Sequence, residues 1–115
     1  MKKTESRIQQ EIVMWFRNTH CRKTNNPQCQ IFSVPNERSN TKEQMRMIST
    51  GLLSGVSDLI VMLPEKVLFV EVKDENGRQS KKQFDFQERA ESLGFEYFLV
   101  RSLEDFQKII QKKFG

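Results

Sequence analysis

Two apolar runs joined by a short turn stand at the centre of the chain. The runs cover residues 59–63 (Leu-Ile-Val-Met-Leu) and 67–70 (Val-Leu-Phe-Val), with Pro64-Glu65-Lys66 between them. Short runs rich in aliphatic and β-branched residues, separated by a turn, predict two strands paired as an antiparallel hairpin. Because both runs are apolar at nearly every position, they are typical of central strands buried on both faces.

The hydrophobic periodicity of the remaining chain predicts helices and further strands around this hairpin. Helical spacing is found at residues 4–22, 41–47, 80–93 and from 102 onward, and strand patterns at residues 30–34 and 95–100. The candidate inward residues of the third helix include Phe84, Ala90 and Leu93. The strand, helix, strand succession after the turn implies a right-handed crossover and hence a parallel strand pair. We therefore expect one α/β domain over residues 1–115, in the order α-β-α-β-β-α-β-α, with a mixed sheet and helices on both of its faces.

Charged residues stand where the two central strands are predicted to begin and end. Asp58 precedes the first run, and Glu71 and Lys73 follow the second. In a hairpin the start of one strand lies opposite the end of the other, and strand alternation places Glu71 and Lys73 on the same face. Burying such charges is unfavourable unless they find a partner. Two carboxylates with waters suit Mg²⁺ or Mn²⁺, so the pattern predicts a divalent-metal site with Lys73 placed to stabilise developing charge.

The same residues have a simpler interpretation. Asp58 can open a strand from a turn, while Glu71 and Lys73 form an ion pair on an exposed edge strand, and acid-x-Lys triplets are frequent by chance. The apolar flanks favour the metal site, because charges at the ends of central strands are not a usual solvated face. The small residues Gly55 and Ser57 also allow backbone or substrate to approach closely.

Two further polar residues are candidates for the same site. Glu11 lies four residues before Trp15 on the inward stripe of the first helix, so it is either a metal ligand or a boundary residue paired with a nearby Lys or Arg. Gln83 stands three residues after Ser80, which makes the two a helix capping box. Because this helix follows the strand that carries Glu71, the Gln83 amide is also a candidate for contacting the attacking water or a phosphate oxygen.

The composition is typical of a soluble globular protein with a basic balance. Apolar residues make up 37% of the chain, charged residues 30%, and the net charge is +4. No run reaches the roughly 18 apolar residues of a membrane helix, and the N-terminal residues do not resemble a secretory signal. The charge favours a phosphate-bearing partner without requiring one. Cys21 and Cys29 do not make a disulfide framework, so we expect a reducing cytoplasm; with His20 they lack the fourth ligand of a zinc site.

In their order along the chain, these residues resemble the VRR-NUC (virus-type replication-repair nuclease) domain, a branch of the PD-(D/E)xK nuclease superfamily. The resemblance covers most of the chain. Its pieces are Glu11, Pro35-Asn36-Glu37, Gly55-Val56-Ser57-Asp58, Glu71-Val72-Lys73, Ser80 to Gln83, Leu93-Gly94-Phe95 and Val100-Arg101-Ser102. One position departs from the family pattern: Ser57 stands where a proline usually precedes the aspartate, a proline that shapes the strand entry and takes no part in the chemistry.

The resemblance implies a restriction-endonuclease-like fold and a metal site that cleaves DNA. The ligands that it implies for Mg²⁺ or Mn²⁺ are Glu11, Asp58, Glu71 and the backbone carbonyl of Val72. Lys73 would be the catalytic lysine, and Gln83 would help to place water or substrate. Asn36 and Glu37 match a less defined family position, and their role is left open.

Small stand-alone members of this family, often phage-encoded, resemble Holliday junction resolvases that act as homodimers. Resolving a four-way junction needs two symmetric cuts, and a two-fold dimer of a chain with one metal site supplies both. The expected function is therefore Mg²⁺- or Mn²⁺-dependent endonucleolytic cleavage of branched DNA in the cytoplasm of a bacterial or phage-infected cell. Three alternatives stay open: a nuclease of flaps, nicks or plain duplex, a DNA-binding module that has lost catalysis, and a structural or partner-binding domain.

Overall fold

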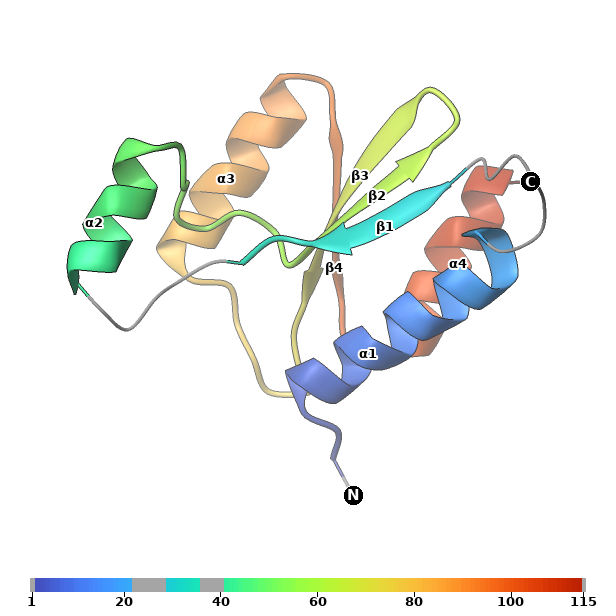
Figure 1. Ribbon diagram of the computed structural model, residues 1–115. Helices are drawn as coiled ribbons and strands as arrows, with labels where there is room; N and C mark the ends of the chain where they lie inside the picture. The colour runs from blue at the N-terminus through green and yellow to red at the C-terminus, as the bar shows by residue number, and fades with distance from the viewer. Residues whose placement is uncertain (1, 22–28, 36–40, 115) are drawn as a thin grey trace.

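A mixed β-sheet forms the centre of the computed structural model, which describes residues 2–21, 29–35 and 41–114 (Figure 1). The elements in chain order are α1 (Glu5–Phe16), the π-helical turn η1 (Arg17–Cys21), β1 (Gln30–Ser33), α2 (Thr41–Ser49), β2 (Leu59–Leu63), β3 (Lys66–Val72), α3 (Lys81–Ser92), β4 (Glu96–Val100) and α4 (Leu103–Phe114). Within the described residues the sheet order is β1-β2-β3-β4, antiparallel except for the parallel pair of β3 and β4. The predicted order, hairpin and parallel crossover are confirmed. Asn36 and Glu37 lie outside the described residues.

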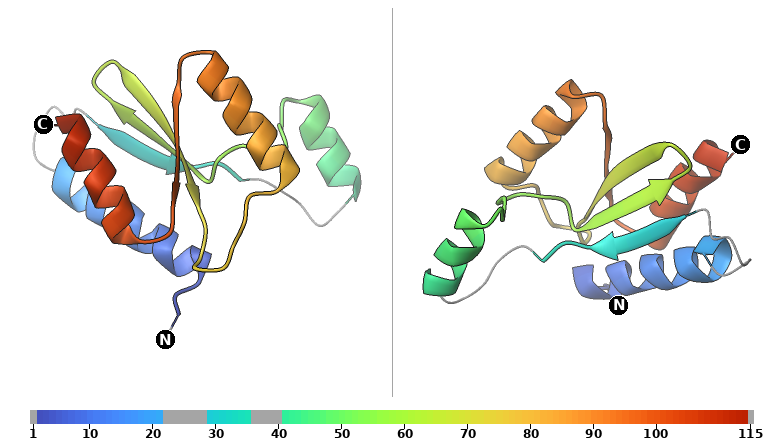
Figure 2. Two further views of the ribbon diagram at one scale, coloured as in Figure 1. Left: turned by 180° about the vertical axis from the view of Figure 1, so that it is seen from behind. Right: turned by 45° about the horizontal axis from the view of Figure 1, so that its top comes forward.

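Helices cover the two faces of the sheet. Figure 2 shows α1 and α4 side by side on one face and α3 on the other. On the α1 and α4 side, Leu68 and Val70 of β3 are fully buried in the core cluster that also contains Phe16 and Phe106. Full burial of one such side chain contributes ~1.5–3 kcal/mol, so this buried cluster contributes strongly to the stability of the fold.

The opposite face of β3 points toward α3. The rings of Phe69 and Phe86 lie 5.2 Å apart, and those of Phe86 and Tyr97 lie 6.1 Å apart. Because side chains alternate along a strand, Glu71 and Lys73 share this face with Phe69. The fold therefore places both charged residues on the side where α3 begins.

The first turn of α3 decides which of its residues face the sheet. The inward stripe is Gln83, Phe86 and Ala90, at positions i, i+3 and i+7. The prediction that Phe84 and Leu93 point inward is wrong, since their side chains are 50% and 69% exposed. Apolar residues stand on both candidate stripes, so periodicity alone could not choose the rotation of the helix.

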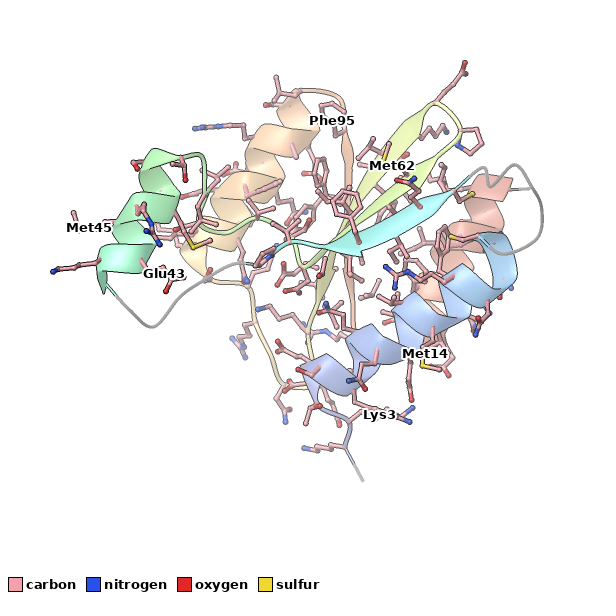
Figure 3. All side chains as sticks on the ribbon, in the orientation of Figure 1. Lys3, Met14, Glu43, Met45, Met62 and Phe95 are labelled. Carbon is pink, nitrogen blue, oxygen red and sulfur yellow. The ribbon has the colours of Figure 1, made fainter. Side chains whose placement is uncertain are left out.

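The α3 face of the sheet is open over β1 and β2. Phe32 and Met62 are 41% and 42% exposed (Figure 3 labels Met62), so β2 is buried on one face rather than on both as predicted. A groove of about 530 Å³ adjoins this region, between α3 and the end of α2, and its lining includes the exposed residues Ile48, Leu53 and Leu93. In the described part of the chain, every helix is too short or too polar to span a membrane.

Candidate functional site

Asp58 and Glu71 meet where the central hairpin opens. Leu59 of β2 pairs with Val70 of β3, so the preceding Asp58 stands level with Glu71. The Asp58 carboxylate also accepts a hydrogen bond of 2.8 Å from the backbone N–H of Val72. This bond fixes one carboxylate oxygen at the end of β3.

Glu71 is the most deeply buried charged residue among those that the structure describes, at 1% exposure. Its Oε2 accepts a hydrogen bond of 2.9 Å from Nε2 of Gln83 and lies 3.4 Å from Nζ of Lys73. Its Oε1 is buried without a hydrogen-bond partner among the described residues. Such an atom is unfavourable in a folded protein unless a ligand or ion satisfies it.

The surroundings of Glu71 favour its protonated form when no cation is present. Burial raises the pKa of this carboxyl, the neighbouring Asp58 raises it further, and Lys73 lowers it, with a result of about 8. A carboxyl whose pKa is raised by burial and by a second carboxylate is characteristic of functional sites. Among the described residues, the ion pair of Glu71 is with Lys73, while Asp58 places a second acidic group beside the same carboxyl.

Gln83 forms the predicted capping box and also contacts Glu71, while its predicted contact with water or a phosphate oxygen stays a prediction. Its Oε1 accepts a hydrogen bond of 2.9 Å from the backbone N–H of Ser80, and the Ser80 hydroxyl accepts one from the backbone N–H of Gln83, which completes the capping box. The other end of the same amide donates to Glu71. Helix capping thus holds the side chain in the orientation that the site uses.

Gly55 brings the segment before Asp58 against the first turn of α3. Its φ is +88°, and a Cβ added there would lie 2.3 Å from the backbone oxygen of Lys82. No other residue type fits this close approach without moving one of the two backbones. The contact ties the segment that leads to Asp58 to the helix turn that carries Gln83.

Ser57 shows how the chain enters β2 at the position where the family pattern has a proline. The side chain is fully buried, and its hydroxyl donates a hydrogen bond of 3.1 Å to the backbone oxygen of Leu59. This local bond shapes the strand entry just before the site.

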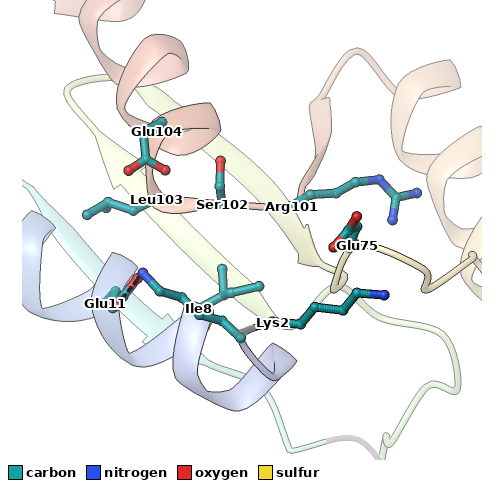
Figure 4. Close-up of a pocket in the computed structure, with 9 residues that line it drawn as sticks. Lys2, Ile8, Glu11, Glu75, Arg101, Ser102, Leu103 and Glu104 are labelled. Atoms are coloured by element: carbon teal, nitrogen blue, oxygen red, sulfur yellow. Dashed lines mark hydrogen bonds and ion pairs between the residues drawn. The ribbon is translucent and has the colours of Figure 1, made fainter.

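Glu11 is not brought to this cluster. Its carboxylate accepts hydrogen bonds of 2.9 Å from Nζ of Lys3 and lies 3.5 Å from Nε of Arg7. Figure 4 shows Glu11 in the pocket beside α4. Of the two possibilities that the sequence left open for Glu11, the structure shows the pairing with nearby basic residues. Among the described residues, no three or more His, Cys, Asp or Glu side chains gather closely enough to hold a metal together.

The acid of α1 that reaches the site region is Glu5, which the sequence reasoning missed. Its Oε2 accepts a hydrogen bond of 3.4 Å from the backbone N–H of Asp74, the residue after Lys73. Glu5 stands three and seven residues before Ile8 and Ile12, so it lies on the same helix face as these core residues. That spacing was the signal that could have found it.

The family model for the VRR-NUC domain matches residues 3–104. The chain belongs to the VRR-NUC family. A solved structure described as a VRR-NUC domain protein is similar to this chain, with a TM-score of 0.68 and 17% sequence identity. The match covers 96% of this chain and 88% of that protein's chain. Another solved structure, described as a VRR-NUC domain, matches with a TM-score of 0.63 and 25% sequence identity. This match covers 95% of this chain and 97% of that protein's chain. Comparison with curated protein sequences gave no match.

Membership in the VRR-NUC family makes this a nuclease domain, which implies DNA as the substrate class. The residues at the centre of the VRR-NUC fold fit a divalent cation. The buried Oε1 of Glu71, which has no hydrogen-bond partner in the described part of the chain, belongs to a carboxyl that interacts with Asp58. Mg²⁺ is commonly held by one or two carboxylates together with substrate phosphates and waters. A two-carboxylate site of this kind does not require a third acidic side chain.

Proposed function

We propose that this protein is a Mg²⁺- or Mn²⁺-dependent DNA endonuclease that cuts branched DNA. The observation that carries the proposal is the pair of Asp58 and buried Glu71, in which Oε1 of Glu71 has no hydrogen-bond partner among the described residues. An enzyme that hydrolyses phosphodiesters needs a concentrated positive charge at the scissile phosphate, and this pair is built to hold one. Two neighbouring carboxyl groups, one of them buried, are a donor set that a divalent cation can bind.

The proposed roles follow from the contacts of each residue. Asp58 and Glu71 hold the cation, with the backbone carbonyl of Val72 at the same strand end. A bound divalent cation supplies Lewis-acid activation and charge neutralisation at the phosphate. Lys73, which is 3.4 Å from Glu71, orients the attacking water and stabilises charge that develops on the phosphate. Gln83 holds Glu71 in place through its amide and stands where it can also contact the water or a phosphate oxygen.

Branched DNA and a homodimer form the finer part of the proposal. One chain presents one such site, whereas a four-way junction is resolved by two symmetric cuts, so a two-fold dimer matches the symmetry of that substrate. The open apolar surface over β1, β2 and the α2–α3 groove supports a dimer, because exposed apolar patches mark interaction sites. We place the enzyme in a reducing cytoplasm, which suits its two free cysteines.

The second candidate is a DNA-binding module without catalysis. The site argues against it, because Asp58, Glu71 and Lys73 are all present, and Glu71 interacts with each of the other two. A degenerate copy would be expected to have lost at least one of them. Nucleases of flaps, nicks or plain duplex share the same chemistry and differ only in the DNA that they accept.

A panel of labelled DNA substrates tests the proposal. Purified protein is incubated with four-way junction, flap, nicked and linear duplex DNA, with Mg²⁺, with Mn²⁺ and with a chelator, beside a sizing column. We expect cleavage of the junction at symmetric positions only with metal, and elution as a dimer. Equal cleavage of linear duplex would contradict the branched-DNA part. Binding without cleavage under every metal condition would contradict the enzymatic part.

A further inference from the structure

The loop that follows Lys73 is held from two sides of the molecule. Lys73 itself donates its backbone N–H to the Val100 oxygen at 3.0 Å, which closes the parallel pairing of β3 and β4. Beyond it, Nη1 of Arg101 donates hydrogen bonds to the backbone oxygens of Asp74 at 2.6 Å and Gly77 at 2.8 Å. From the other side, Glu5 accepts a hydrogen bond from the backbone N–H of Asp74.

The same loop folds back over the side chain of Lys73. A Cβ added to Gly77 would lie 3.3 Å from Cδ of Lys73 and 2.9 Å from Oε2 of Glu5, so Gly77 lies close beside the lysine stem with little room for a side chain. The Lys73 side chain is only 11% exposed although it ends in an ammonium group. The position of Gly77 therefore limits the directions that the Lys73 side chain can take, and it leaves the ammonium group beside Glu71.

Arg101 is placed to control this restriction. It follows β4 directly, at the start of the segment that leads into α4, and Figure 4 shows it extending toward the loop that carries Glu75. One guanidinium nitrogen bridges the first and last carbonyls of the turn Asp74–Gly77, whose own closing bond, Gly77 N–H to the Asp74 oxygen, is long at 3.3 Å. Charge-assisted hydrogen bonds to two carbonyls are stronger than that single neutral bond.

We propose that Arg101 is a positioning residue, which clamps the Asp74–Gly77 turn over the stem of Lys73 and so holds the Lys73 ammonium group at Glu71. The inference rests on the proposed function for its effect on cleavage, but the clamp itself is a property of the folded chain. Supporting residues that orient groups at a metal site typically affect activity 10–100-fold. Arg101→Ala should therefore lower kcat by about 10–100-fold while leaving the Kd for DNA nearly unchanged.

The test uses two readouts, of which one does not depend on activity. The first compares kcat and the Kd for DNA in wild type, Arg101→Ala and Arg101→Lys, with Arg46→Ala as a control that removes the same charge from an exposed position on α2. The second measures acylation of Lys73 by mass spectrometry, in metal-free protein without DNA, relative to the exposed Lys108 of α4. Arg101→Met, which keeps the aliphatic stem and removes all donors, takes the place of Arg101→Ala should the latter not fold.

The expected result is a severalfold rise of Lys73 acylation in Arg101→Ala together with the fall in kcat. Arg101→Lys should recover part of both, because an ammonium can still donate to a carbonyl, and Arg46→Ala should match wild type. Unchanged Lys73 acylation would overturn the proposal. The proposal would also be overturned if Arg101→Ala lost only DNA affinity and showed a shallower salt dependence of binding. That result would identify Arg101 as a phosphate contact. If wild type cuts no DNA at all, the proposed function fails, and the acylation result alone still decides the role of Arg101.

Discussion

Replacing Glu71 by Gln should abolish cleavage and make the metal-free protein more stable. The substitution keeps the size of a side chain that is 1% exposed and keeps an acceptor for Gln83, while it removes a carboxyl whose ionisation beside Asp58 is unfavourable. Active sites commonly hold groups that reduce stability, and relieving one such group typically gains about 0.5–2 kcal/mol. For a domain of this size that gain corresponds to a rise in Tm of roughly 2–8 °C.

The stability gain of Glu71→Gln should depend on pH. The pKa of Glu71 is about 8 in the folded protein and near 4.5 in the unfolded chain. Between these values the folded state binds the proton more tightly, so the free energy of unfolding of the metal-free wild type falls as pH rises from about 4.5 to about 8. The variant lacks this slope, and its advantage is largest above pH 8.

Thermal unfolding with a chelator across this pH range, together with a cleavage assay with Mg²⁺, measures both effects. Glu88→Gln is the matched control, because it makes the same change on the exposed surface of α3 and should leave cleavage and Tm unchanged. Residual cleavage by Glu71→Gln near the wild-type rate, or a lower Tm than wild type at pH 8 and above, would contradict the assignment of Glu71.

Replacing Lys73 by Met should also remove cleavage, but with the opposite effect on stability. Loss of a positioned charge that stabilises the transition state typically lowers kcat about 10²–10³-fold, while DNA affinity depends mainly on other basic residues and should change little. In the metal-free protein the substitution leaves Asp58 and Glu71 without the cation that lies 3.4 Å from Glu71. Removing one partner of a buried ion pair is destabilising. We therefore expect the Tm of metal-free Lys73→Met to lie below that of wild type, whereas the Tm of Glu71→Gln lies above it.

Single-turnover cleavage, filter binding and thermal unfolding of Lys73→Met give the three quantities. Lys108→Met on the exposed side of α4 is the control, since it removes the same ammonium away from the site. A Kd for DNA that rises in parallel with the fall in kcat would place Lys73 in substrate binding rather than at the reacting phosphate.

The convergence of Asp58 and Glu71 could be predicted from the sequence because strand geometry determines it. Two apolar runs and a turn of three residues define an antiparallel pair, and the alternation of side chains then fixes which residues share a face. The observed register places Asp58 level with Glu71 and puts Lys73 on the same face. The functional roles of these residues stay a prediction, which the variants above test.

The position of Glu11 could not be decided in the same way. Helical spacing tells which residues face the sheet, but not which turn of the helix lies over the site, because that depends on the packing of α1 against α4 and β3. The structure pairs Glu11 with Lys3 and places Glu5, two turns earlier, at the loop after Lys73. The rotation of α3 was ambiguous for a related reason, since its apolar residues occupy two stripes and a polar contact, Gln83 to Glu71, selects between them.

Whether Asp58 and Glu71 hold a divalent cation is tested most directly by calorimetry. Mn²⁺ is titrated into the metal-free wild type and into the variants Asp58→Asn and Glu71→Gln. We expect saturable binding to wild type, with a rise in Tm on saturation because the folded state alone has the site, and loss of both signals in each variant. Absence of saturable binding to wild type, or undiminished binding by Glu71→Gln, would contradict the proposed metal site.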